Sequence, residues 1–217
     1  EGRFIKAEVQ SFGVRMAEIP PGQRDGGAGP AEGIILLFDG TKASVPIRSG
    51  FVASSPYSIQ REDGHLFLAK DGRSLEEVHL PPVPAYYRLS TADGIPYRKI
   101  ALLHGTDCFG STVIPGCVYW NSKLGCKFCG IGLSLEVEAP YMKDPQQLAE
   151  VAQAASKHDG VRHVTLTSGS TQNGSLEIKY LASCAKEIKR RTNLPIHIQL
   201  VPPEDLGLLE VLKEAGV

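Results

Sequence analysis

Three cysteines near the middle of the chain form its densest group of residues able to carry out chemistry. The stretch from Cys117 to Gly132 reads CVYWNSKLGCKFCGIG, with eight residues between Cys117 and Cys126 and two between Cys126 and Cys129. Thiolates converging from one loop suit zinc or an iron–sulfur cluster. Three protein ligands also leave one coordination position open, as a catalytic centre requires. The spacing therefore predicts a metal centre with an open position.

The elements that must hold this loop follow from the pattern of the second half of the chain. Asp144-Pro145 is typical of a helix start, and Gly160 of a helix end. Strand and helix patterns alternate three times, with strands predicted within 107–119 and over 161–167 and 196–201, and with helices after Asp144, around Leu181–Ile188 and after Asp205. This alternation predicts parallel strands joined by helical crossovers, which is an α/β fold.

Three polar segments follow the predicted parallel strands. They are the cysteine loop, residues 168–171 and residues 202–204. Because chemistry in such folds lies at the carboxyl ends of the strands, we expect the three segments to share one site. Within the strands, Val164 and Leu166 alternate with Thr165 and Thr167. Helices must cover the apolar face, so the polar face is expected to line a ligand cavity.

Residues 1–107 show a different pattern of short strands and turns, and this pattern does not indicate a particular reaction or ligand. Short strands are expected at 5–9 and 13–16, and two hairpins at 34–47 and 57–70, the latter two turning at Asp-Gly dipeptides. The proline-rich stretch 79–87 is expected to be an extended linker. We therefore predict a small β-rich or α+β domain over 1–107, followed by a second domain over 108–217.

The cysteine loop resembles that of the radical S-adenosylmethionine (SAM) superfamily. The features shared are three cysteines after an early strand and an aromatic residue, Phe128, directly before the last of them. Most members have three residues between the first two cysteines, so the gap of eight is a departure that concerns the subfamily. The later stretches HVTLTSGST and IHIQLVPPED extend the resemblance over residues 108–217. The chain is also similar to a bacterial subfamily encoded beside nitrilases.

The resemblance implies a fold and two cofactors. The fold is an incomplete (β/α) barrel of about three strand–helix units, because VLKEAGV ends where another strand is due and the chain is expected to be a fragment. Cys117, Cys126 and Cys129 would each bind one iron of a [4Fe–4S] cluster, whose fourth iron binds S-adenosylmethionine. Reductive cleavage of this cofactor gives a 5′-deoxyadenosyl radical, which abstracts hydrogen from a substrate that the sequence does not identify. An electron donor such as flavodoxin or ferredoxin is implied.

The resemblance also assigns cofactor-binding residues. Phe128 would shield the cluster or pack near the adenine, although plain core packing explains it equally well. Ser168, Gly169 and Ser170 stand where the family has a Gly-Gly-Glu stretch that contacts the methionine amino group, and only the middle glycine matches. The alternative for this segment is an ordinary strand–helix loop. Glu204 would approach the ribose or the substrate, or else is a carboxylate at a helix start. Catalytic residues are not identified.

A second hypothesis is a metal-binding module without radical chemistry. In it, zinc or an iron–sulfur cluster is structural or carries electrons, and Cys108 or His104 supplies a fourth ligand. The chain lacks a second Cys-x-x-Cys pair or a histidine pair at zinc-finger spacing. Cys184 lies on an apolar helix face and is expected to be a small buried hydrophobic residue.

Composition limits the partners. The formal net charge of the 217 residues is −1 and no basic stripe is present, so a nucleic acid is not expected. No apolar run reaches the roughly 20 residues of a membrane span. Five cysteines, three of them in one loop, argue against a disulfide framework and favour the cytoplasm. A small-molecule substrate is the remaining expectation.

Overall fold

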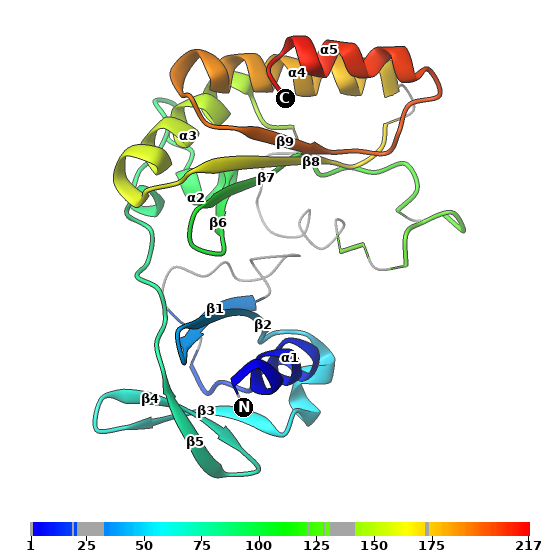
Figure 1. Cartoon of the computed structure of the whole chain (residues 1–217). Coiled ribbons are helices and arrows are strands. Elements are labelled where there is room, and N and C mark those ends of the chain that lie inside the picture. The colour runs from blue at the N-terminus through cyan, green and yellow to red at the C-terminus, as the bar shows by residue number, and fades with distance from the viewer. Residues whose placement is uncertain are drawn as a thin grey trace. The chain divides into compact units, whose positions relative to one another are not determined.

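The computed structural model describes residues 2–18, 20, 33–120, 122–127, 129–130, 142–171 and 174–217. The chain divides into two compact units, Glu1–Val83 and Pro84–Val217, and each is described by itself (Figure 1). None of the helices in the described part of the chain combines the length and the apolar character of a membrane span.

The N-terminal unit combines one α-helix with five strands. Its strands form a two-stranded antiparallel sheet, β1–β2, and a three-stranded antiparallel sheet in the order β3-β4-β5. The elements are α1 (Gly2–Phe12), β1 (Gly33–Phe38), β2 (Thr41–Pro46), the 3-10 helix η2 (Gly50–Ser54), β3 (Tyr57–Glu62), β4 (His65–Lys70) and β5 (Arg73–Val78). Their buried side chains form one core, to which α1 contributes Val9. This unit is thus of the α+β kind.

Asp-Gly dipeptides make the tight turns of this unit. In Asp39-Gly40, Asp63-Gly64 and Asp71-Gly72 both residues have positive φ, between 46° and 87°. This conformation matches the right-handed twist of the flanking strands, and glycine adopts it without steric cost. The two predicted hairpins are confirmed as β1–β2 and β3–β4. The third Asp-Gly turn adds β5, a strand that was not predicted.

The strand predicted at 5–9 is wrong, because these residues belong to helix α1. Ile5 and Val9 are four residues apart and therefore share one helical face, and both pack on the core of the unit. Gly13, with a φ of 70°, follows the helix. The strand predicted at 13–16 is reduced to an isolated bridge between Arg15 and Ser58.

The C-terminal unit contains the predicted alternation of strands and helices. Its four-stranded sheet has the order β6-β7-β8-β9, in which β6 is antiparallel to β7, and β7, β8 and β9 are parallel. The elements are the 3-10 helix η3 (Ala85–Arg88), α2 (Tyr97–Ile100), β6 (Leu102–His104), β7 (Cys108–Ile114), α3 (Pro145–Asp159), β8 (His163–Ser168), α4 (Gly174–Arg191), β9 (Ile196–Gln199), the 3-10 helix η5 (Leu206–Leu208) and α5 (Leu209–Glu214). The prediction of three parallel strands joined by helices is confirmed.

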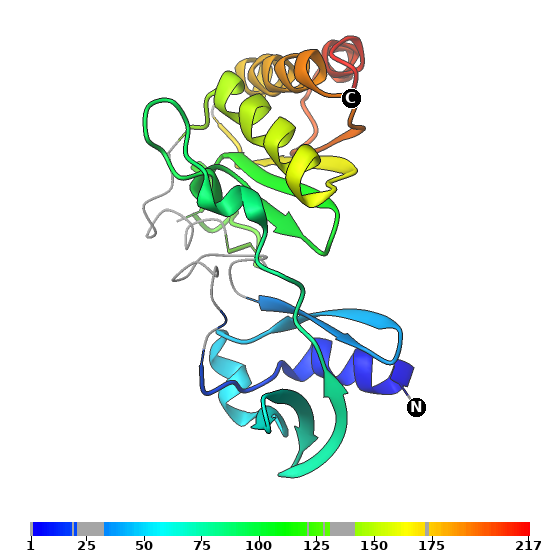
Figure 2. The same cartoon turned by 90° about the vertical axis from the view of Figure 1, so that its left-hand side faces the viewer.

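Helices cover one face of this sheet. Figures 1 and 2 show α3, α4 and α5 on the same side of β7, β8 and β9. Phe109, Val164 and Leu166 are fully buried beneath them, together with the apolar faces of α3 and α4. The opposite face carries Thr165, which is half-buried, and His197, which is exposed. The predicted division into an apolar covered face and a polar face is therefore correct.

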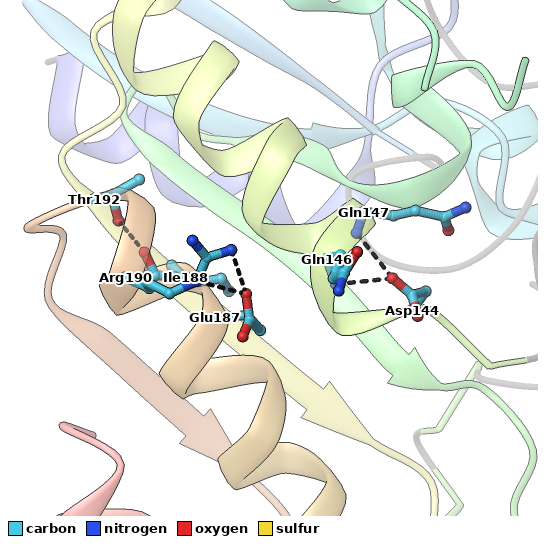
Figure 3. A network of polar contacts seen from close by, with 7 residues as sticks. All are labelled: Asp144, Gln146, Gln147, Glu187, Ile188, Arg190 and Thr192. Atoms are coloured by element: carbon cyan, nitrogen blue, oxygen red, sulfur yellow. Dashed lines mark hydrogen bonds and ion pairs between the residues drawn. The ribbon is translucent and has the colours of Figure 1, made fainter. Parts of the chain in front are cut away.

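The ends of α3 and α4 show why their boundaries were predictable. Asp144 accepts hydrogen bonds from the backbone N–H groups of Gln146, at 2.8 Å, and Gln147, at 3.1 Å (Figure 3). Gly160 takes the left-handed conformation that ends α3, with a φ of 65°. At the end of α4, the hydroxyl of Thr192 donates to the Ile188 carbonyl at 2.9 Å. The Asp144 carboxylate thus satisfies two N–H groups that α3 leaves without a partner, whereas the Thr192 hydroxyl adds a second donor to a carbonyl that already accepts from the Thr192 N–H group.

The division between the units falls earlier in the chain than the position predicted between residues 107 and 108. Residues 84–107 belong to the second unit because their apolar side chains enter its core, among them Tyr86, Tyr97 and Ile100. The carboxylate of Asp159, the last residue of α3, also accepts the backbone N–H groups of Ala85, at 2.6 Å, and Tyr86, at 2.9 Å. The proline-rich stretch 79–87 spans the observed division.

Candidate functional site

The cysteine loop leaves the carboxyl end of β7 and folds into successive tight turns. Each turn is closed by a backbone hydrogen bond from an N–H group to a carbonyl three residues earlier. The pairs are Trp120 to Cys117, Ser122 to Tyr119, Gly125 to Ser122 and Cys129 to Cys126, at 3.0 to 3.2 Å. The eight-residue gap between the first two cysteines is therefore compact.

Gly125 makes this compaction possible. A Cβ atom at this position would lie 2.8 Å from the carbonyl oxygen of Tyr119 and 3.2 Å from that of Trp120. A contact under 3.0 Å with backbone cannot be relieved by turning a side chain. Any larger residue at 125 would therefore push the turns apart, and the glycine directly before Cys126 has a steric reason.

None of the five cysteines is in a disulfide. Cys117 is half-buried, whereas Cys126 and Cys129 are exposed. Among the described residues, no three His, Cys, Asp or Glu side chains are grouped closely enough to hold a metal ion, so the three thiols are not gathered into a ligand set. Phe128 lies outside the described residues, and its predicted place beside the cluster stays a prediction.

The turn after β8, residues Ser168–Thr171, packs directly against the start of the cysteine loop. The N–H group of Gly169 donates to the Ile114 carbonyl at 2.7 Å, and the Ser170 carbonyl accepts from the Val118 N–H group at 2.9 Å. A Cβ on Gly169 would lie 2.2 Å from the Gly116 carbonyl oxygen and 3.0 Å from the Cys117 Cβ. Glycine at 169 thus permits a contact that no other residue would allow.

The two serine hydroxyls of this turn have different environments. Ser168 Oγ donates to the Gly169 carbonyl at 2.7 Å, within the turn itself. Ser170 is 7 % exposed, and its Oγ is buried without a hydrogen-bond partner. A buried hydroxyl without a partner costs free energy, so such an atom in a folded protein is a candidate contact for a bound group.

Glu177 was not singled out from the sequence, yet it contacts the same turn. Its Oε2 accepts a hydrogen bond from the Thr171 N–H group at 3.0 Å, and the residue is 5 % exposed. Both residues also line a pocket of about 580 Å³. The other lining residues are Ile114, Met142, Leu176, Lys179, Tyr180 and Ser183. The signal in the sequence was an acidic residue in the first turn of a helix, which usually indicates only a favourable charge at a helix start.

Glu204 lies in the segment between β9 and η5 and is exposed. The neighbouring Asp205, rather than Glu204, caps the following 3-10 helix, through its contact with the Gly207 N–H group at 2.9 Å. The carboxylate of Glu204 is therefore not used as a cap of η5. Its predicted approach to the ribose or the substrate stays a prediction.

Cys108 and His104, considered as fourth ligands of a zinc site, lie at the wrong end of the sheet. They pair with each other across β6 and β7, at the amino end of β7. Cys117 follows the carboxyl end of this seven-residue strand, which at the usual rise is about 20 Å away. Neither residue completes a site with Cys117. Burial raises the pKa of the Cys108 thiol, which also contacts the Thr165 hydroxyl at 3.4 Å.

The polar face of the sheet carries paired hydroxyl groups. Thr112 Oγ1 and Thr167 Oγ1, on neighbouring strands, are 2.9 Å apart and form a hydrogen bond. His197 and Gln199 of β9 are exposed on the same face, because they pair in register with Thr165 and Thr167. The carboxyl end of this face leads to Ser168 and to the cysteine loop. This face is therefore a polar surface whose carboxyl end adjoins the cysteine loop, and its role as the lining of a ligand cavity stays a prediction.

Comparison with known proteins identifies the C-terminal region. The searches of curated proteins and of solved structures gave no significant match. The family model described as the Radical SAM superfamily matches residues 113–217, which begin at the end of β7 and include the cysteine loop and the turn after β8. Residues 113–217 are therefore identified as a radical SAM domain, in agreement with the resemblance of the three cysteines and the strands that follow them.

Proposed function

We propose that this chain is part of a radical SAM enzyme that binds a [4Fe–4S] cluster through Cys117, Cys126 and Cys129. When bound, the cluster and S-adenosylmethionine supply a 5′-deoxyadenosyl radical that abstracts hydrogen from a small-molecule substrate. The chain's own residues hold these groups, orient them and exclude water. The family assignment supports an enzyme in general, and the cluster, the cleavage and the substrate class are the proposal.

One observation carries the proposal beyond the family assignment. Two backbone hydrogen bonds join the turn Ser168–Thr171 to the chain on both sides of Cys117, at Ile114 and at Val118, and Gly169 packs against Gly116 and Cys117. The segment expected to contact the methionine amino group of the cofactor is therefore fixed beside the first expected cluster ligand. This arrangement supports one shared site at the carboxyl ends of β7 and β8.

The residues fit the proposed groups by their chemistry. Three thiols outside disulfides are the donor set of a site-differentiated [4Fe–4S] cluster. The hydrogen bond from the Cys129 N–H group to the Cys126 carbonyl brings the last two cysteines into one turn. Ser170 supplies carbonyl and hydroxyl oxygens, which can accept hydrogen bonds from an ammonium group. Phe128 and Glu204 are proposed as further contacts of the cofactor.

The remaining parts of the proposal concern the surroundings of the site. The parallel strands β7, β8 and β9 with their helices are proposed as three units of a radical SAM barrel, preceded by a separate N-terminal domain. A reductant such as flavodoxin or ferredoxin would deliver the electron, and the cytoplasm is the proposed location. Membership of the subfamily encoded beside nitrilases is also part of the proposal.

The test is anaerobic reconstitution followed by addition of the cofactor. The protein should bind about four irons and four sulfides per chain. Adding S-adenosylmethionine to the reduced protein should change the EPR spectrum of the cluster, because the cofactor binds the iron that lacks a protein ligand. Slow formation of 5′-deoxyadenosine should accompany the change even without the substrate. A colourless protein containing zinc, or a cluster whose spectrum ignores the cofactor, would support the metal-binding module instead.

A further inference from the structure

Glu177 is a buried carboxylate outside the expected cluster ligands and cofactor contacts. It lies in the first turn of α4 and is 5 % exposed. Burying a carboxylate costs free energy unless hydrogen bonds compensate for the lost water. Its Oε2 accepts from the backbone N–H group of Thr171 at 3.0 Å, so the side chain ties α4 to the turn after β8.

The turn that Glu177 holds touches the chain on both sides of Cys117. Before this cysteine, the Gly169 N–H group donates to the Ile114 carbonyl at 2.7 Å. After it, the Ser170 carbonyl accepts from the Val118 N–H group at 2.9 Å. A path of two hydrogen bonds therefore leads from Glu177 through the peptide of Ser170 and Thr171 to the residue next to Cys117.

We propose that Glu177 is a positioning residue for Cys117. In this proposal the Glu177 carboxylate accepts a hydrogen bond that fixes the turn 168–171 on the long helix α4. That turn then fixes the backbone of Cys117. The position of the Cys117 thiol relative to Cys126 and Cys129 then depends on α4, a helix outside the cysteine loop. The consequence for a cluster rests on the proposed function, whereas the local contact does not.

The competing explanation is that Glu177 only places a negative charge at the start of α4, where it interacts favourably with the helix dipole. The two explanations differ in what they require. Positioning needs an acceptor oxygen, which the carboxamide of Glu177→Gln retains. The dipole effect needs a charge, which both Glu177→Gln and Glu177→Ala remove. The two variants therefore separate the explanations.

Asp159→Ala is the matched control. Asp159 is also a carboxylate of a helix in this unit that accepts backbone N–H groups of a neighbouring segment, those of Ala85 and Tyr86. It lies at the end of α3 that precedes β8, at the opposite end of the sheet from the turn after β8. Its loss should destabilise the unit without changing the surroundings of Cys117.

The first measurement uses the purified chain without metal. Amide hydrogen exchange at Val118 and the rate of Cys117 alkylation by iodoacetamide, both read by mass spectrometry, report the order of this segment. Glu177→Ala should raise both by about tenfold, as expected for the loss of one buried hydrogen bond. Glu177→Gln should stay within about threefold of the unaltered protein, and Asp159→Ala should leave both unchanged. Equal effects of Glu177→Ala and Glu177→Gln, equal effects of Glu177→Ala and Asp159→Ala, or no effect of Glu177→Ala would each overturn the proposal.

The second measurement uses the reconstituted, reduced protein. Glu177→Ala should alter the EPR line shape of the cluster and weaken its response to S-adenosylmethionine, and Glu177→Gln should restore both. An unaltered spectrum in Glu177→Ala would overturn the proposed consequence for the cluster. If the unaltered protein binds no cluster, the proposed function fails, while the exchange and alkylation rates still decide whether Glu177 positions Cys117.

Discussion

Cysteine has two opposite environments in the C-terminal unit, one in the cysteine loop and one in the helical layer formed by α3, α4 and α5 on the sheet (Figure 1). Cys126 and Cys129 are exposed and lie in short turns that backbone hydrogen bonds close. Cys184 lies in α4, fully buried, and burial raises the pKa of its thiol to about 12. The first environment leaves the sulfur atoms accessible to a metal, and the second makes the thiol a small apolar side chain.

The helical layer and the cysteine loop are also stabilised by different interactions. The helical layer is stabilised by buried apolar side chains of α3, α4 and the sheet, such as Leu148, Leu166 and Leu181. The described part of the cysteine loop exposes several apolar residues, including Leu124 at 75 %. A loop with little buried surface gains order from a bound metal more than a packed core does. The loop is therefore expected to be the part of this unit that responds most to the cluster.

The largest expected effect is the loss of the cluster from variants of the loop. Replacing Cys117, Cys126 or Cys129 by Ala should remove most of the bound iron, because a site with three protein ligands has no spare thiolate. Cys184→Ala should keep the full iron content, since that thiol is buried in α4. Iron and sulfide analysis after anaerobic reconstitution measures both. A full cluster in Cys117→Ala would refute the ligand assignment.

The next effect is the difference in reactivity between exposed and buried thiols. At pH 8 only about one thiol in ten thousand is ionised when the pKa is about 12, and thiolate is the reacting form. Iodoacetamide should therefore alkylate Cys126 and Cys129 in the folded chain at least about a hundredfold faster than Cys184. Peptide mass spectrometry over time gives the rates, and the difference should disappear in urea. Similar rates in the folded chain would contradict the burial of Cys184.

Local signals in the sequence were sufficient to predict the helices and strands of the helical layer and its sheet. The ends of α3 are set by side-chain capping at Asp144, by Pro145 in the first turn and by the backbone conformation of Gly160. These effects depend only on residues nearby in the sequence. The alternation of apolar residues in β8 gave its two faces for the same reason. The recognition of the radical SAM domain rested likewise on a short motif and the strands after it.

Contacts between distant segments could not be predicted in the same way. Residues 5–9 are compatible with a strand or with a helical face, and packing against the β-strands of the unit selected the helix. In the sequence Gly169 was only the one matching position of a three-residue family motif, while its steric reason lies in Gly116 and Cys117, about fifty residues earlier. The contact between Glu177 and Thr171 also depends on how the turn meets α4. Such partners become visible only once the chain is folded.

A variant of Gly169 tests the contact between the turn 168–171 and the start of the cysteine loop, with a smaller expected effect. In Gly169→Ala the new methyl group would lie 2.2 Å from the Gly116 carbonyl oxygen, so the turn and the cysteine loop must separate. Overpacking of this kind costs about 1–3 kcal/mol. The midpoint of urea unfolding should therefore fall, and the iron content should fall with it.

The matched control for this variant is Gly174→Ala at the start of α4. Among the described residues, no atom outside α4 itself lies within 4 Å of a Cβ at that position, and alanine is the better helix former. The control should leave the iron content unchanged and stability equal or slightly higher. If Gly169→Ala behaved like the control, the close contact between the turn and Cys117 would be wrong.

The smallest expected effect concerns the cap of α3, which belongs to the helical layer. Asp144→Ala removes the acceptor of two backbone N–H groups and should lower the free energy of unfolding by about 1 kcal/mol. For a chain of this size that corresponds to a fall in Tm of about 2–4 °C, measurable by circular dichroism. Asp144→Asn retains an acceptor oxygen and should lose less. Both variants should bind the full cluster, because within the described residues the hydrogen bonds of the Asp144 carboxylate stay inside the first turn of α3. Loss of iron from Asp144→Ala at a temperature where it is folded would show that the loop depends on the helical layer, and that the two regions are not independent.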